Sequence, residues 1–144
     1  MGTFLPVGLN LSRKKILIVG GGRTALQKIK MLGQFTNNIL VVAPSILPEV
    51  GALVKCKLDR YNKKYLPKSG LVYACTNDKV INARIKREAN ARHLLVNVVD
   101  DPALCDFISP AIHKAEEMTV AVSSDGKNVK KSVAWRDKIA EILT

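Results

Sequence analysis

The sequence is poor in the residues on which metal centres and disulfide frameworks depend. It contains three cysteines, Cys56, Cys75 and Cys105, and two histidines. The cysteines are far apart in or beside apolar segments, and no CxxC pair or His/Cys cluster occurs. Such spacing indicates reduced, buried thiols and does not predict a structural metal. We therefore expect neither a metal site nor a disulfide.

Long apolar runs are also missing. No stretch approaches the ~20 apolar residues that a membrane-spanning helix requires. The first residues lack the basic start and apolar core of a secretory signal. The sequence therefore predicts a cytoplasmic protein without a membrane partner.

Acidic residues are few: the sequence has 12 Asp and Glu residues and 23 Lys and Arg residues, which gives a net charge of +11. The basic residues are spread over several segments, which favours an anionic partner. Aromatic residues make up 5% of the chain, and no RNP, helix-turn-helix or zinc-finger pattern is present. Net charge is therefore the sole sequence feature that favours binding to nucleic acid. Each group of basic residues is explained equally well as the solvent-exposed face of a helix. We expect no nucleic-acid partner, with a basic nucleic-acid-binding protein as an alternative.

The strongest motif is a glycine turn between an apolar strand and a helix. Residues 16–19 are apolar, and Gly20, Gly21, Gly22 and Ala25 then form a GxGxxA pattern. In dinucleotide-binding proteins the first glycine permits a tight turn, the second lets the backbone approach the pyrophosphate, and the third small residue lets helix and strand pack. The helix N-terminus supplies free N–H groups to the anion. The alternative is a turn that only closes the connection.

The apolar pattern predicts alternating strands and helices. Continuous apolar runs at 16–19, 39–43, 71–75 and 94–99 indicate strands covered on both faces, and 52–58 suits an exposed edge strand. Helical spacing places Ala25, Ile29 and Leu32 on one face, with Lys28 and Lys30 turned outward, and predicts a crossover helix over 77–92. This order predicts an α/β fold with a Rossmann-type doubly wound parallel sheet over residues 1–112.

Residues 113–144 are expected to form a short C-terminal extension. A strand at 119–123 is followed by a helix at 129–143 that carries Trp135, Ile139 and Ile142 on one face. This apolar stripe needs a surface to cover, so the extension is interpreted as a dimerisation element and the protein as a homodimer.

Ligands of open parallel sheets bind at the carboxyl ends of the strands. The second strand ends at Ala43 and Pro44 without the acidic residue that usually holds a ribose, so the choice between NAD and NADP stays open. Residues 76–78 equally suit a cap for the following helix. The predicted cofactor residues are Gly20, Gly21, Gly22, Arg23, Thr24, Ala43, Pro44, Thr76, Asn77, Asp78 and Asn97.

The fourth of these buried strands ends near two adjacent aspartates with different expected roles. Pro102 suits the first position of a helix, so Asp101 is predicted to be its N-cap. Asp100 is not needed for that cap and is predicted to be a proton acceptor at the strand end. His113 is a candidate ligand contact or a structural histidine.

Several blocks in one order resemble a known family over nearly the whole chain. They are Phe4-Leu5-Pro6-Val7, the turn at Gly20-Gly21-Gly22, Ala74-Cys75-Thr76-Asn77-Asp78, Asn97-Val98-Val99-Asp100-Asp101-Pro102, Phe107-Ile108-Ser109-Pro110 and Val120-Ala121-Val122-Ser123-Ser124. They are similar to the precorrin-2 dehydrogenase modules of siroheme synthases. The resemblance implies NAD-dependent oxidation of precorrin-2 to sirohydrochlorin, with Asp100 as proton acceptor. It places Ser124 near the tetrapyrrole, and we assign Ser109, Pro110 and His113 to the same substrate.

The resemblance also has two departures. Residues 125–129 replace the glycines and Ser-Pro that usually follow the serine pair. Family members continue into a longer helical region that completes the dimer and, in bifunctional members, supports iron insertion, whereas this sequence carries one such helix. We therefore expect a dehydrogenase without ferrochelatase activity. A catalytically inactive dinucleotide-binding sensor is the alternative.

Overall fold

The computed structural model describes residues 2–143, which form two compact units. One unit contains residues 6–107, and the other contains residues 108–143 together with the first residues up to Leu5. This division lies a few residues before the predicted one. The reason is that residues 111–115 pair with a later strand in the second unit.

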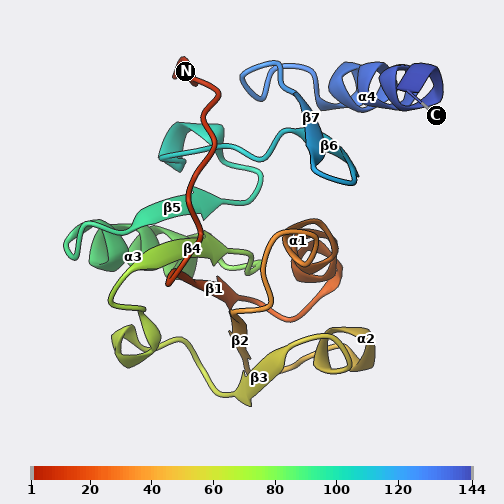
Figure 1. Cartoon of the computed structure of the whole chain (residues 1–144). Helices are drawn as coiled ribbons and strands as arrows, with labels where there is room; N and C mark the ends of the chain where they lie inside the picture. The colour runs from red at the N-terminus through yellow and green to blue at the C-terminus, as the bar shows by residue number, and fades with distance from the viewer. Residues whose placement is uncertain (1, 144) are drawn as a thin grey trace. The chain divides into compact units, whose positions relative to one another are not determined.

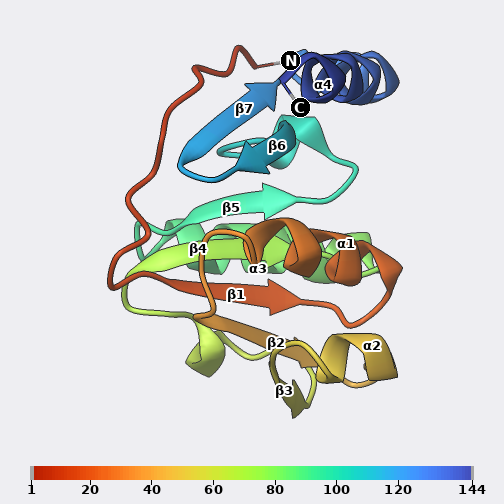
Figure 2. The same cartoon turned by 45° about the vertical axis from the view of Figure 1, so that its right-hand side comes forward.

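The larger unit is built on a five-stranded parallel sheet. Its strands are β1 (Lys15–Val19), β2 (Ile39–Ala43), β3 (Lys55–Leu58), β4 (Gly70–Ala74) and β5 (Leu95–Val98). Their order is β3-β2-β1-β4-β5, and every neighbouring pair is parallel (Figure 2). The chain therefore reverses its direction of winding between β1 and β4, where such sheets bind ligands. The Rossmann-type prediction is confirmed, and β3 is the expected edge strand.

Helices cover both faces of this sheet. Figure 1 shows α1 (Arg23–Leu32) on one face and α3 (Lys79–Asn90) on the other. The short α2 (Pro48–Gly51) and two 3-10 turns, Lys63–Tyr65 and Pro102–Leu104, complete the unit. The sequence did not predict α2 or the turn at 63–65, because both are shorter than a helical repeat can reveal.

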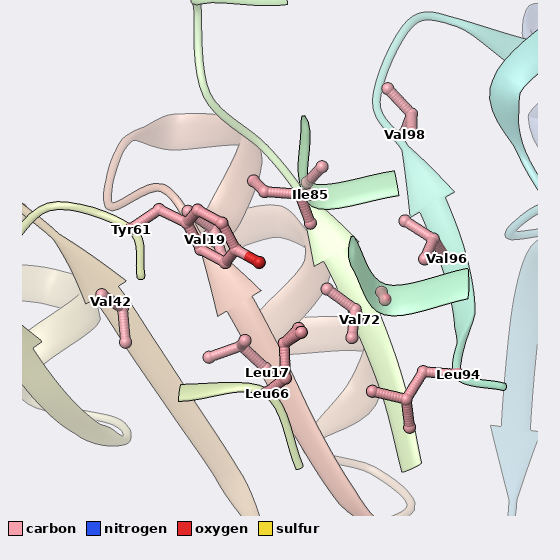
Figure 3. Close-up of a cluster of buried hydrophobic side chains, with 12 residues drawn as sticks. Leu17, Val19, Val42, Tyr61, Leu66, Val72, Ile85, Leu94, Val96 and Val98 are labelled. Carbon is pink, nitrogen blue, oxygen red and sulfur yellow. The ribbon is translucent and has the colours of Figure 1, made fainter. Parts of the chain in front are cut away.

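Each face of the sheet has its own apolar core. On the α3 side, the β-strand residues Leu17, Val72 and Val96 pack against Ile85 (Figure 3). On the α1 side, Ile16 and Ile18 belong to a second cluster with Ala25 and Ile29. Ala25 is fully buried, which fits its predicted role as the small residue between helix and strand.

Lys28 does not point outward as its helical position predicted. Its side chain is half-buried, and its ammonium lies 6.0 Å from the centre of the Tyr73 ring on β4. Lys30, two residues later, is exposed as expected. Lys28 lies at the margin of the apolar stripe, three residues after Ala25, where a long side chain reaches the sheet.

Asp106 ties the end of β5 to α3. Its carboxylate accepts hydrogen bonds from Lys86 Nζ, from Asn90 Nδ2 at 2.7 Å and from the Val96 N–H at 2.9 Å. Partial burial opposes ionisation of Asp106, but these donors outweigh it and hold the pKa of the carboxyl below its usual value. The ionised form therefore stabilises the native state.

We expect Asp106→Asn to lower the free energy of unfolding by about 1 kcal/mol at pH 7, because an amide NH₂ would face three donors. The native pKa is depressed, so this stabilisation is present above the unfolded pKa of about 4 and is lost as pH falls through the native pKa. Urea unfolding at pH 7 and pH 3 measures the difference, with Asp137→Asn as an exposed control. An equal loss at both pH values would contradict this account.

The smaller unit contains a hairpin and a helix. Strands β6 (Ala111–Ala115) and β7 (Met118–Val122) pair antiparallel, and α4 (Val129–Leu143) packs on them. The strand expected at 119–123 and the helix at 129–143 are confirmed, whereas β6 was not predicted. A tight turn with Glu116 at φ 54° joins β6 directly to β7. Pairing with β7 therefore stabilises β6 although its own sequence has a weak strand pattern. No helix within residues 2–143 is long and apolar enough to cross a membrane.

Candidate functional site

A cavity of about 1090 Å³ opens at the carboxyl ends of β1, β2 and β4. It lies where the sheet reverses its winding. The structure brings together all the predicted cofactor residues except Asn97 in its lining, together with Ser45, which follows them at the end of β2, and it adds Arg60, Tyr61, Ile81 and Arg84, which were not predicted. The last three of these come from loop or helix positions whose place beside the cavity depends on tertiary packing, so no local pattern reveals them.

The three positions of the glycine turn differ in whether the structure requires glycine there. Gly20 has φ +125°, and a Cβ there would lie 2.5 Å from the Cys75 carbonyl oxygen. A Cβ on Gly21 would lie 2.5 Å from the Ser45 carbonyl oxygen. A Cβ on Gly22 would meet nothing within 4 Å, and its backbone is extended. The fold therefore requires Gly20 and Gly21, whereas Gly22 faces open space in the cavity wall.

The first turn of α1 leaves its N–H groups available. Gly22 is the N-cap, and no side chain caps the helix. No acidic residue occurs in the first turn, which begins with the exposed Arg23. Uncapped N–H groups and the positive end of the helix dipole together form a site for an anion.

The β2 end of the cavity is basic. Ala43 ends the strand, and Pro44 and Ser45 follow it without a carboxylate, while Arg60 also lines the cavity. The nearby Asp59 follows β3, but its carboxylate accepts a hydrogen bond from the Tyr65 hydroxyl. That bond holds the pKa of Asp59 below its usual value, with the Arg60 N–H adding to the effect. Asp59 is therefore already engaged within the fold.

The loop after β4 is fixed by a buried amide. Asn82 on α3 accepts from Thr76 Oγ1 at 2.6 Å and donates to the Thr76 carbonyl at 3.0 Å. Asp78 caps α3 by accepting from the N–H groups of Val80 and Ile81 at 2.9 and 3.2 Å. Asp78 therefore caps α3, which was one of the two predicted roles of residues 76–78. Thr76 and Asn77 line the cavity. Asn82 was missed because it lies inside a helix pattern.

Asn97 lies in β5 and outside the lining of the cavity. Its side chain is buried, and Nδ2 donates to the Phe107 carbonyl at 3.0 Å. Its Oδ1 has no hydrogen-bond partner. Phe107 in turn packs edge-on against Tyr73, with ring centres 5.4 Å apart. The structure therefore shows a contact of Asn97 with the segment after β5.

Asp100 and Asp101 differ in conformation. Asp100 is exposed just beyond β5 and has φ 61°, a left-handed conformation that costs energy for a non-glycine residue. Asp101 stands at the N-cap of the 3-10 turn Pro102–Leu104, but its side chain makes no capping hydrogen bond. The predicted side-chain cap is wrong, because the backbone of Asp101 (φ −137°, ψ 75°) does not bring its carboxylate to the N–H groups of this short turn.

Cys75, which lines the cavity, is held in its protonated thiol form. Burial raises the pKa of the Cys75 thiol to about 12, and Lys28 opposes this shift only in part. Cys56, Cys75 and Cys105 are all free. Within residues 2–143 no cluster of three or more His, Cys, Asp or Glu side chains could hold a metal ion.

The residues predicted to contact substrate lie in the smaller unit. Ser109 and Pro110 immediately precede β6, and His113 lies within it. The Ser109 Oγ and His113 Nε2 atoms are buried and have no hydrogen-bond partner. Ser124 has a local role, since its hydroxyl accepts from the Asn128 N–H at 2.8 Å and so orders the turn before α4. Ser109 and His113 therefore keep unused hydrogen-bonding capacity, whereas Ser124 is partly engaged.

Comparisons with known proteins agree with these features. Residues 7–111 match a family model described as putative NAD(P)-binding. The siroheme synthase of Psychrobacter cryohalolentis is 42% identical over 132 residues, covering 88% of this chain and 25% of that protein. Siroheme synthase 1 of Cronobacter sakazakii is 38% identical over 145 residues, covering 97% of this chain and 31% of that protein. The chain thus spans about a quarter to a third of these relatives.

A solved structure is similar over nearly the whole chain. SirC, a precorrin-2 dehydrogenase, matches with a TM-score of 0.80 and 25% sequence identity. The match covers 98% of this chain and 69% of that one. Together with the curated relatives, it confirms the resemblance that the sequence blocks indicated.

Proposed function

Because the chain belongs to the putative NAD(P)-binding family, we propose that it is an NAD-dependent dehydrogenase that oxidises precorrin-2 to sirohydrochlorin in siroheme biosynthesis. The observation that carries the proposal is the cavity at the strand ends, whose wall contains the glycine turn and the uncapped start of α1. The similarity to siroheme synthases and to SirC supports the choice of substrate.

The residues present fit a dinucleotide. Gly20 and Gly21 shape a turn that no side chain could enter, and Gly22 leaves open space beside the free N–H groups of α1. These groups would bind the pyrophosphate, with Arg23 and Thr24 next to it. Ala43 and Pro44 would border the adenosine half, and Thr76, Asn77 and Asp78 would border the central and nicotinamide part. We assign Asn97 to the nicotinamide end, where its free Oδ1 supports a contact.

The reaction removes a hydride and a proton from the substrate. A bound nicotinamide supplies the hydride acceptor, so the chain has to supply a base for the proton. Asp100 is exposed at the end of β5, is held in a strained conformation and is not used for capping. The proton passes from the substrate to a carboxylate oxygen of Asp100, which later releases it to water.

The charge of the chain suits this substrate. Precorrin-2 carries eight carboxylates, and the net charge of +11 favours capture of such a polyanion. Ser109 and His113 offer buried hydrogen-bonding atoms without partners beside Pro110, which supports their assignment to substrate. The free thiols of Cys56, Cys75 and Cys105 suit a reducing compartment, so we place the reaction in the cytoplasm.

Calorimetric titration with NAD and an absorbance assay of precorrin-2 oxidation test this function. We expect saturable NAD binding and a parallel appearance of NADH and sirohydrochlorin. NAD binding without turnover would favour a dinucleotide-binding sensor. Absence of NAD binding together with retention on nucleic acid would favour the basic nucleic-acid-binding alternative.

We also propose that the protein is a homodimer through the smaller unit. Trp135 is 55% exposed on α4, where Lys131 lies 5.5 Å from its ring, and Ile142 is 81% exposed. Exposed apolar side chains of this size on one helix are typical of an interface. The dimer would bring a second copy of α4 onto this face.

We expect Trp135→Glu to convert the dimer into monomers, because a charged side chain would replace the apolar indole and its burial in the interface would be unfavourable. Sedimentation velocity over a range of concentrations measures the change. Glu141→Gln, on the same helix, is the control and should remain dimeric. A wild-type protein that sediments as a monomer at high concentration would contradict the proposed interface.

A further inference from the structure

The larger unit has a second concave site, which begins at the amino ends of β1 and β4. Its volume is about 570 Å³, and it shares no lining residue with the cavity at the carboxyl ends of the strands. None of its described lining residues is Asp or Glu. Half of them are basic, namely Arg13, Lys15, Lys57, Lys64 and Lys68. We call this site the basic pocket.

Strand alternation explains why two of these lysines lie on one face of the sheet. Lys15 is two residues before Leu17, which belongs to the core on the α3 side, so both side chains lie on that face of β1. Lys57 on β3 pairs in register with Val42, another residue of the same core. The segment 63–69, which returns to β4, supplies the remaining wall. The α3-side face is therefore apolar at its centre and basic at this margin.

Most of these positive charges have no counter-ion in the fold. Within residues 2–143, four of the five cations form no ion pair: Arg13, Lys15, Lys57 and Lys68. Lys64 Nζ lies 4.0 Å from the Asp59 carboxylate, which also accepts a hydrogen bond from the Tyr65 hydroxyl. Cations gathered in one concave site repel one another, and a bound anion would remove that repulsion.

A smaller pocket continues the basic surface. It has a volume of about 310 Å³ and shares Lys68 and Ser69 with the basic pocket. Lys14 and Arg92 line it, and again none of the described lining residues is acidic. Lys14 Nζ donates to Ser69 Oγ at 2.7 Å, and Arg92 donates to the Lys63 carbonyl at 3.1 Å. A ligand with several anionic groups could therefore contact cations in both pockets.

The shape and composition of the basic pocket favour a small molecule over nucleic acid. Its volume lies within the range of about 300–1,000 Å³ that is usual for small-molecule sites. Sites for single-stranded nucleic acid stack bases on aromatic side chains. Tyr65 is the one aromatic residue in the described lining, and the Lys64 ammonium lies 5.2 Å from the centre of its ring.

We propose that the basic pocket binds a small polyanion, a molecule that carries two or more phosphate or carboxylate groups. Lys15, Lys57 and Lys68 would contact these groups. Lysine presents a flexible point charge with no fixed fork, which suits anionic groups at variable spacing. This site is separate from the dinucleotide cavity and takes no part in the dehydrogenation proposed above.

The test is calorimetric titration of the whole chain with inorganic tripolyphosphate and, separately, with citrate, each with and without saturating NAD. The variant Lys57→Gln/Lys68→Gln removes two exposed charges of the basic pocket. The variant Lys30→Gln/Arg87→Gln removes two exposed charges of the same unit outside both pockets and is the matched control. We expect one tripolyphosphate or citrate per wild-type chain in the presence of NAD. Its affinity should fall by about tenfold in the first variant and stay at the wild-type value in the control.

Tighter binding of tripolyphosphate would identify a phosphate compound as the ligand, and tighter binding of citrate a carboxylate compound. An equal affinity in the wild type and Lys57→Gln/Lys68→Gln, or an equal loss in both variants, would overturn the proposal. Absence of binding of both anions would also overturn it, and the lysines would then serve to protect the edge strand β3 from pairing with other chains. A short duplex DNA that binds through Lys57 and Lys68 when neither small anion does would assign the surface to nucleic acid instead. Circular dichroism checks that both variants are folded.

Discussion

Asp100→Asn should lower precorrin-2 turnover by roughly 10²–10⁴ while leaving NAD affinity nearly unchanged. The amide keeps the size of the side chain but cannot accept the proton. Asp100 lies outside the lining of the cavity that we assign to the dinucleotide, so binding of NAD should not depend on it. Steady-state kinetics and calorimetric titration of the same preparation measure both quantities.

Asp101→Asn is the matched control for this experiment. It makes the same chemical change one residue later, and the Asp101 side chain forms no capping bond. Its effect on stability should therefore fall below the about 0.5–2 kcal/mol that loss of a true N-cap costs, with turnover close to wild type. Full activity in Asp100→Asn would remove this residue from the mechanism. A large loss in Asp101→Asn would show that the two roles had been assigned to the wrong residues.

The sequence predicted the sheet well because its strands are buried on both faces. Continuous apolar runs gave β2 at its observed bounds and placed β1, β4 and β5 within about a residue at each end. The pattern could not predict β6, whose residues Ala111–Ala115 alternate weakly and depend on pairing with β7. Local periodicity thus reveals strands that burial defines, and misses strands that a partner defines.

The candidate site was predictable where it depends on backbone geometry. Gly20 needs a positive φ and Gly21 needs a close approach, and both requirements are visible as glycines after a strand. Lys28 was misplaced because its contact joins α1 to the distant Tyr73, and Asn82 was missed because its amide turns back onto Thr76 in the loop before the helix. A helix pattern marks Asn82 as an ordinary polar position and Lys28 as an outward one.

Gly22→Val should abolish NAD binding without unfolding the protein, because the fold itself leaves room for the new side chain. The extended backbone of Gly22 is accessible to valine, and an added Cβ meets no atom within 4 Å. The branched side chain would occupy the space where the pyrophosphate approaches the first turn of α1. Calorimetric titration with NAD measures the loss, and circular dichroism with thermal unfolding checks the fold.

Two further glycine variants make this result specific. Gly51→Val also adds a side chain in open space, but outside the cavity lining, so NAD affinity should stay at the wild-type value. Gly20→Val forces a β-branched residue into φ +125° against the Cys75 carbonyl, so it should destabilise the fold itself. Undiminished NAD affinity in a folded Gly22→Val protein would rule out the placement of the pyrophosphate at this turn. Loss of binding in Gly22→Val and not in Gly51→Val would show that Gly22 is required for the ligand, whereas Gly20 is required for the turn.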